Sequence, residues 1–274
     1  VNEIFKNFKA NDYVLLFSAG ASIGTLFLWG ASYIFPEGEI VGGRRVFENI
    51  PKVLQYIFYV LSAATIFISG YLFSLRVKNW TRGKEEKRKV KLSERILSLL
   101  DGLTMRTVLR FKAAGFMHSL IYIGFLGLFA GTVTLEVHHL MPPSLKFLQG
   151  TTYIVYSFTL ELATIAYLTG LFWALVRRLR GAEYRIQTKT TSDDYLTLSL
   201  LIFIGISGIT TEAGRIALEG FPDYERWSFI GYAFADLINL TNPSLFHRIS
   251  WILHVVSFLV FLIALPLSKF RHLF

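Results

Sequence analysis

The sequence has no cysteine among its 274 residues, and only 17% of its residues are charged. Without cysteine, the chain can form no disulfide, no thiolate zinc site and no cysteine-ligated iron–sulfur cluster. A typical soluble domain is about 25% charged, so the low charge argues against a water-soluble protein. The chain also has no glycine-rich phosphate loop and no HExxH zinc motif, which excludes sites built on those two motifs.

The sequence is rich in long apolar runs. Hydrophobic residues make up 53% of the chain, and they occur in runs of about 20 residues, the length that spans the hydrocarbon core of a bilayer. The sequence therefore predicts an all-α integral membrane protein, a six-transmembrane-helix bundle forming a single membrane domain over residues 1–274. The predicted spans lie near residues 13–35, 53–75, 113–137, 152–176, 195–217 and 249–268.

The net charge of +9 arises in the loops between these spans. Of the 28 Lys and Arg residues, 21 lie on the side that holds both chain ends, and 7 lie on the opposite side. Under the positive-inside rule, both termini are cytoplasmic. The charge thus reflects topology, and we expect no nucleic-acid partner. The first apolar run is too long for a cleavable signal peptide.

The cytoplasmic loop over residues 76–112 contains two segments of different character. Residues 84–89 form a charged run that is typical of a solvated loop. Residues 92–111 place leucine and isoleucine at helical spacing among arginines, as in an amphipathic helix at a membrane surface. The same helix would also suit a cytoplasmic partner, and the pattern does not separate the two.

Histidines form the main candidate site. His118, His254 and His272 lie within predicted spans or at their ends, where ionisable groups commonly carry function. Imidazole is the usual axial ligand of haem iron between helices. The predicted topology places His118 and His272 at a similar depth near the cytoplasmic side, as two ligands of one haem require.

A second pair is predicted near the outer face. His254 precedes His272 by 18 residues, about 27 Å along a helix, so it would face His138 or His139 at the end of the third span. The alternative interpretation is that these histidines make structural hydrogen bonds at the membrane interface. His247 falls in a predicted outer loop, and we assign it no role.

The segment from His254 to His272, with its Pro266-Leu-Ser-Lys-Phe-Arg-His ending, resembles the last span of the respiratory nitrate reductase gamma-subunit family. Residues 117–125 resemble that family's other ligand helix. Residues 208–217 are most similar to the cytochrome b-like membrane domain of heterodisulfide-reductase-related iron–sulfur oxidoreductases, which include electron-transfer-flavoprotein:menaquinone oxidoreductases. The likeness covers about residues 111–274.

The resemblance implies b-type haems and names their ligands. His118 and His272 would hold the haem nearer the cytoplasm, and His254 would ligate the outer haem. The position of the family's remaining ligand is occupied by Leu128 here. Either His138 or His139 replaces that ligand, which gives two haems, or only one haem is bound.

Quinone chemistry needs protonatable groups, because two protons accompany two electrons. The loop over residues 142–146 resembles a family loop whose lysine lies beside the outer haem at the quinol site, which corresponds to Lys146. Glu136 and Glu212 also lie near the outer face. Alternatively, Glu212 forms a structural pair with Arg215.

Local patterns suggest structural roles elsewhere. Asp193 and Asp194 are predicted to cap the fifth span at its N-terminus. Glu161 has a weaker claim to a quinone or proton site. The glycines of the first span are interpreted as close helix packing; they are Gly20, Gly24 and Gly30.

We predict a membrane cytochrome b subunit or domain that transfers electrons between a cytoplasmic iron–sulfur module and the membrane quinone pool, with menaquinone implied by the resemblance. One alternative is a haem-free membrane anchor for a soluble redox enzyme. Another is a small proton-linked transporter, although the sequence shows no inverted repeat of the transporter kind.

The missing cysteine bears on the partners. Iron–sulfur clusters would lie in a separate cysteine-rich, heterodisulfide-reductase-like subunit or in a fused cytoplasmic domain. The sequence begins at Val1 and stops two residues after His272, so we expect a continuation beyond residue 274. The resemblance further implies electron-transfer flavoprotein as a partner and the prokaryotic cytoplasmic membrane as the location.

Overall fold

The structure, a computed structural model, describes residues 9–34, 42–80, 82, 91–105, 108–110, 112–181, 190–239 and 242–270. Within these ranges the chain forms helices and connecting turns, with no strand. Six helices are long and apolar enough to cross a membrane. They are α1 (Ala10–Ser32), α2 (Lys52–Trp80), α4 (Lys112–Leu140), α5 (Thr151–Arg180), α7 (Ser192–Leu218) and α9 (Pro243–Leu267).

These helices confirm the predicted all-α fold and its six spans. Even α1, with 23 residues, extends about 35 Å, more than the roughly 30 Å hydrocarbon core of a bilayer. The remaining elements are short. They are α3 (Leu92–Leu103), α8 (Phe229–Asn239) and the 3₁₀ turns η2 (Val108–Arg110), η3 (Pro143–Leu145) and η4 (Asp223–Trp227).

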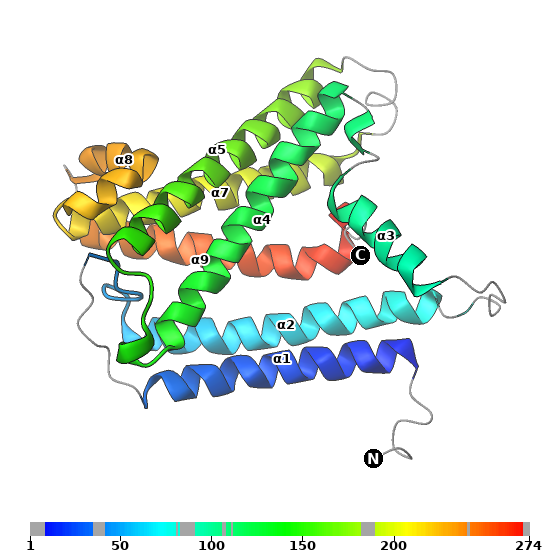
Figure 1. Cartoon of the computed structure of the whole chain (residues 1–274), viewed down its shortest axis with the longest axis horizontal. Helices are drawn as coiled ribbons and strands as arrows, with labels where there is room; N and C mark the ends of the chain where they lie inside the picture. Colours follow the sequence, from blue (N-terminus) through cyan, green and yellow to red (C-terminus); the bar gives the residue numbers. More distant parts are fainter. Residues whose placement is uncertain are drawn as a thin grey trace.

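The long helices pack against one another in pairs, and α2 with α9 joins distant parts of the sequence. α1 lies on α2, α2 on α9, and α9 on α7, whereas α4 and α5 pair with each other and cross the rest diagonally (Figure 1). The start of α1 and the end of α9 lie at the same end of the bundle, near α3 (Figure 1). This agrees with the predicted common side of the two termini; the cytoplasmic assignment stays a prediction. The opposite end carries η4 and α8, and we call it the α8 end.

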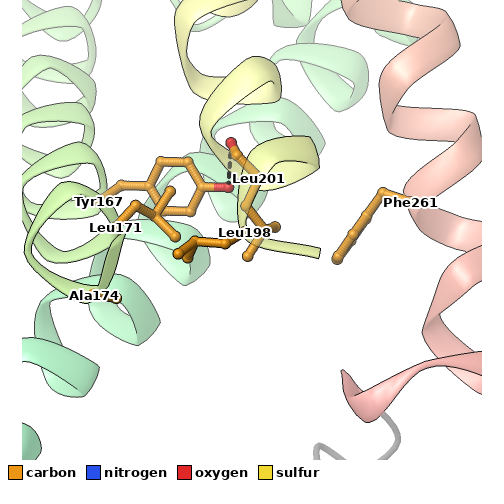
Figure 2. Close-up of a cluster of buried hydrophobic side chains, with 6 residues drawn as sticks. All are labelled: Tyr167, Leu171, Ala174, Leu198, Leu201 and Phe261. Carbon is orange, nitrogen blue, oxygen red and sulfur yellow. Dashed lines mark hydrogen bonds between the residues drawn. The ribbon is translucent and has the colours of Figure 1, made fainter. Parts of the chain in front are cut away.

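The core joins α5, α7 and α9. Figure 2 shows the Tyr167 hydroxyl, which donates to the Leu201 carbonyl oxygen at 3.0 Å, with Phe261 on the far side of α7. Tyr167 is buried, and its hydroxyl would be costly there without a partner. The bond therefore fixes α5 against α7.

Pro266 lies inside α9 and contributes a second cross-link. Proline has no N–H, so the Leu262 carbonyl one turn earlier loses its helical donor. The Ser69 hydroxyl of α2 donates to that carbonyl oxygen at 2.7 Å. The bond satisfies this acceptor and ties α2 to α9.

Several local predictions are corrected. α9 begins at Pro243, so His247 lies inside the helix and is buried, not in a loop. The N-cap of α7 is Thr191, and Asp194 completes a capping box with it. α3 covers only the first part of the predicted amphipathic segment, and all its residues are exposed. The charged run 84–89 lies outside the described residues.

The glycines of α1 do not make the close packing predicted for them. A Cβ added at Gly20, Gly24 or Gly30 meets no atom within 4 Å. Residues 20–24 also match a Gly-x-Ser-x-Gly pattern. Ser22 lies within the helix, however, and donates to Ser18, so it is not the exposed strand-to-helix turn of a hydrolase nucleophile.

Gly124, in contrast, sets the approach of α4 to α5. A Cβ there would lie 2.5 Å from the Tyr167 backbone nitrogen and 2.7 Å from the Ala163 carbonyl oxygen. Both contacts are backbone, so the helices would have to separate. We expect Gly124→Ala to destabilise the bundle by about 1–3 kcal/mol, measured by thermal unfolding in detergent.

The matched control for this variant is Gly24→Ala in α1. Because a Cβ is unobstructed there, alanine should be neutral or stabilise by about 0.5–1 kcal/mol through helix propensity. Equal unfolding temperatures for Gly124→Ala and the wild type would contradict the close contact of α4 with α5.

Candidate functional site

His254 lies in α9, half-buried against α7. Its Nδ1 is 3.1 Å from the Ile204 carbonyl oxygen and 3.1 Å from the Ser207 hydroxyl. A carbonyl only accepts hydrogen bonds, so Nδ1 carries the proton, and the neutral ring has its lone pair on Nε2. This is the tautomer that a metal-ligating histidine adopts when a backbone carbonyl orients it.

Gly208 makes room for this ring. A Cβ at Gly208 would lie 3.3 Å from Cε1 of His254, tighter than an ordinary van der Waals contact. The predicted sequence likeness around residues 208–217 thus falls where α7 approaches the histidine of α9.

His118 is half-buried in α4, close to the end of the bundle that carries α3. Its predicted partner, His272, lies outside the described residues. The pairing of these two histidines therefore stays a prediction.

His138 and His139 end α4 in different surroundings. His138 is only 1% exposed, and its Nδ1 accepts the N–H groups of Phe147 and Leu148 at 3.2 and 3.1 Å. The neutral ring then keeps its proton on Nε2, which has no hydrogen-bond partner among the described residues. Nε2 of His138 is thus a donor, whereas a metal ligand must offer a lone pair.

His139 instead faces an aromatic cluster. Its ring packs edge-on against Phe47 at 5.3 Å, and Phe47 also contacts Trp251 at 6.0 Å. Trp251 lies one turn before His254 on α9. Of the two adjacent histidines, His139 is therefore the one whose ring shares neighbours with the helix of His254.

Lys146 caps the end of α4. Its Nζ donates to the carbonyl oxygens of His138 and His139 at 3.1 and 3.0 Å. These carbonyls have no intrahelical donor at a helix C-terminus, and a lysine there also complements the helix dipole. In this arrangement the Lys146 side chain holds the histidine-bearing end in place.

Glu136 lies one turn earlier on α4. The buried Tyr59 hydroxyl of α2 donates to its carboxylate at 2.8 Å. Tyr59 also stacks on Trp29 of α1. Glu136 thus joins the polar and aromatic surroundings of His139.

Glu212 meets Glu161 at the start of α8. Glu161, in α5, is 3% exposed and accepts the N–H groups of Ile230 and Gly231, both at 3.3 Å. A Cβ on Gly231 would lie 2.7 Å from Oε2 of Glu212. Both carboxyl groups therefore lie at Gly231, and we call them the Glu161–Glu212 pair.

Arg215 forms ion pairs with Glu225 and Glu219, whereas the sequence suggested Glu212 as its partner. Its guanidinium bonds Glu225 at 2.7 Å and Glu219 at 3.1 Å. Tyr153 donates to the same Glu225 oxygen at 2.6 Å. Glu225 is fully buried. Burial alone would raise the pKa of Glu225, but Arg215 and these hydrogen bonds outweigh it and lower the pKa.

Tyr224 marks the edge of this network. Burial, and then the negative charge of Glu219, raises the pKa of Tyr224 to about 12. Its hydroxyl is 3.5 Å from Glu219. Tyr224 therefore stays protonated at neutral pH and donates toward Glu219.

Two curated proteins are similar to this chain. The EtfAB:quinone oxidoreductase of Syntrophomonas wolfei is 28% identical over 253 residues, which cover 86% of this chain and 34% of that protein. The probable iron-sulfur-binding oxidoreductase FadF of Bacillus subtilis is 25% identical over 223 residues, covering 79% and 31%. Both are named as oxidoreductases.

The chain thus spans about a third of the length of these curated relatives. No protein-family model matches it, and no solved structure matches it. The similarity supports the oxidoreductase part of the predicted resemblance. The likeness to nitrate reductase gamma subunits stays a prediction.

Two features of the site were missed in the sequence. The sequence ranks Glu161 below Glu212 as a quinone or proton site. Its position in the middle of a predicted span was the feature that pointed to such a role. The ion pair of Arg215 with Glu225 was not anticipated, because Glu225 belongs to η4 between the spans. Within the described ranges, no group of three or more His, Asp or Glu side chains could hold a metal ion.

Proposed function

We propose that this chain is the membrane part of a quinone-linked oxidoreductase and carries electrons between an iron–sulfur module and menaquinone. The six apolar helices and the two oxidoreductase relatives support this role. The iron–sulfur clusters would be held outside this chain, which has no cysteine.

The observation that carries the proposal is the environment of His254. An imidazole inside a spanning helix, with Nδ1–H held by the Ile204 carbonyl, presents Nε2 as a fixed lone pair in an apolar environment. The arrangement fits an axial ligand of haem iron.

The proposed ligands are His254 with His139 for an outer haem, and His118 with His272 for an inner one. The hydrogen bonds of His138 favour His139 over it, since Nδ1 of His138 already accepts two N–H groups. Bound b haems would supply one-electron redox chemistry within the membrane.

The protein's own groups would serve the quinone. Near His139, Glu136 and the Tyr59 hydroxyl form a hydrogen-bonded pair, able to orient a quinone oxygen. Lys146 keeps the end of α4 in place by bonding its last carbonyls. Glu212, with Glu161, would act farther along at the α8 end.

The proposed partners follow from the same role. A cysteine-rich, heterodisulfide-reductase-like subunit or fused domain would dock on the α3 side, and an electron-transfer flavoprotein would exchange electrons with it. We propose that this side is cytoplasmic and that the protein resides in the prokaryotic cytoplasmic membrane.

Visible spectroscopy of the purified full protein tests the proposal. We expect a b-type α-band after reduction with dithionite, two haems per chain by pyridine haemochrome, and reoxidation of the band by a soluble menaquinone analogue. No α-band would favour the haem-free anchor. An α-band that no quinone reoxidises would contradict the quinone role. Proton flux without either would favour the transporter.

A further inference from the structure

Two carboxyl groups from different spanning helices share one site at the start of α8. Glu161 accepts hydrogen bonds from the N–H groups of Ile230 and Gly231. The Glu212 carboxyl group lies beside the same Gly231, with Oε2 2.7 Å from the position that a Cβ would take. The two carboxyl groups thus meet at the backbone of one residue, Gly231. Their helices, α5 and α7, bring together residues 51 positions apart in the sequence.

Two carboxyl groups held this close in a buried site favour keeping one proton between them. An ionised carboxylate is only an acceptor, and two ionised carboxylates in contact repel strongly in a low-dielectric interior. The two backbone N–H groups on Glu161 stabilise one negative charge. The favoured state of the pair therefore has one ionised carboxyl group and one protonated carboxyl group.

Arg215 provides an independent sign of a bound molecule nearby. It is 5% exposed, and its Nε is buried with no hydrogen-bond partner among the described residues. Buried N–H groups are rarely left unpaired, and ordered water is the usual partner. A water molecule at Nε of Arg215 would sit beside the ion pair with Glu225.

A chain of polar groups leads from the pair toward the surface. Ser228, two residues before Ile230, donates its hydroxyl to Oε2 of Glu225 at 3.1 Å and contacts the Ser157 hydroxyl. Glu225 continues through Arg215 to Glu219, near Tyr224. The other charged or titratable groups facing the pair are Arg44 and Tyr156.

We propose that Glu161 and Glu212 form a proton-binding site that holds one proton and exchanges it with water at the α8 end through Ser228 and Glu225. Release breaks one carboxyl O–H bond and transfers the proton to water, with no change of oxidation state. For the proposed quinone reaction, the site would take up or supply one proton; this role rests on the proposed function, whereas the shared proton does not.

Infrared spectroscopy of the purified full protein tests the shared proton. A protonated carboxyl group has a C=O stretching band above the carboxylate bands, and this band shifts downward in D2O. We expect the wild type at neutral pH to show such a band. In the Glu161→Gln/Glu212→Gln double variant, the intensity of the band should fall by the amount that one protonated carboxyl group contributes. The exposed Glu48, paired with Arg45, provides the control: Glu48→Gln should leave the band unchanged.

Folding of the variants is checked by gel filtration and thermal unfolding. If the double variant does not fold, Glu212→Gln alone carries the test, because it removes one member of the pair and should abolish the shared-proton band. An unchanged D2O-sensitive band in a folded variant would overturn the proposal. Loss of the band in a protein without quinone reactivity would uphold the proton site and reject the proposed function.

Discussion

Replacing His254 by alanine is expected to remove one of the two proposed haems from each chain. The variant deletes Nε2, the proposed iron ligand, and leaves the Ile204 carbonyl without the Nδ1–H donor. Loss of an interaction that only orients a ligand typically weakens metal binding by about 10–100-fold, and loss of the ligand itself should exceed that. Electron transfer to a quinone analogue should fall at least as far.

The measurement is pyridine haemochrome per chain, with the reduced-minus-oxidised spectrum of the same sample. The matched control is His247→Gln. His247 lies on the same helix, is buried, and uses Nδ1 in a contact with Asn49 at 3.3 Å. Its substitution should leave the haem content unchanged. Full haem content in His254→Ala, or equal losses in both variants, would exclude His254 as a ligand.

The second large effect concerns stability. We expect Arg215→Met to lower the free energy of unfolding by about 3–5 kcal/mol, the usual cost of removing one partner of a buried ion pair. The variant strands Glu225, which is fully buried and bonded to Arg215 at 2.7 Å. Glu219 loses the same partner.

A neighbouring pair supplies the control. Arg226 and Asp223, in the same turn η4, form an ion pair at 3.0 Å, but their side chains are 68% and 89% exposed. Arg226→Met should therefore change stability by only about 0–1 kcal/mol. Thermal unfolding in detergent compares the two variants, and similar unfolding temperatures would show that the pair of Arg215 with Glu225 contributes little.

A double variant distinguishes the loss of the attraction between Arg215 and Glu225 from the cost of leaving the Glu225 carboxylate buried and unpaired. Arg215→Met together with Glu225→Leu should recover part of the loss, because the main penalty of the single variant is an unpaired buried carboxylate. A double variant less stable than Arg215→Met would contradict this reason and indicate that Glu225 is held mainly by Tyr153 and Ser228.

The spans could be predicted well because their signal is local. An apolar run that is long enough to cross a bilayer commonly forms a helix, because a helix makes all its backbone hydrogen bonds within the segment. α8 was missed because its 11 residues are too few to cross a membrane. His247 was misplaced for a related reason: α9 begins at Pro243, before the apolar run that marked the predicted span.

The candidate site was only partly predictable. His254 could be predicted as a functional residue, because an ionisable side chain inside a membrane span commonly carries function. The difference between His138 and His139 was not visible, since the two are adjacent in the sequence. Their separation depends on the turn after α4, whose Phe147 and Leu148 N–H groups return to one ring only.

The sequence by itself determined that the chain is helical and that six of its apolar segments are long enough to cross a membrane. Only the tertiary structure decided which ionisable groups come together: Glu161 with Glu212 at Gly231, and Arg215 with Glu225. The physical reason is that lipid and helix interfaces are both apolar. A spanning helix therefore carries no clear polar stripe, and its rotation is set by contacts with helices that are distant in the sequence.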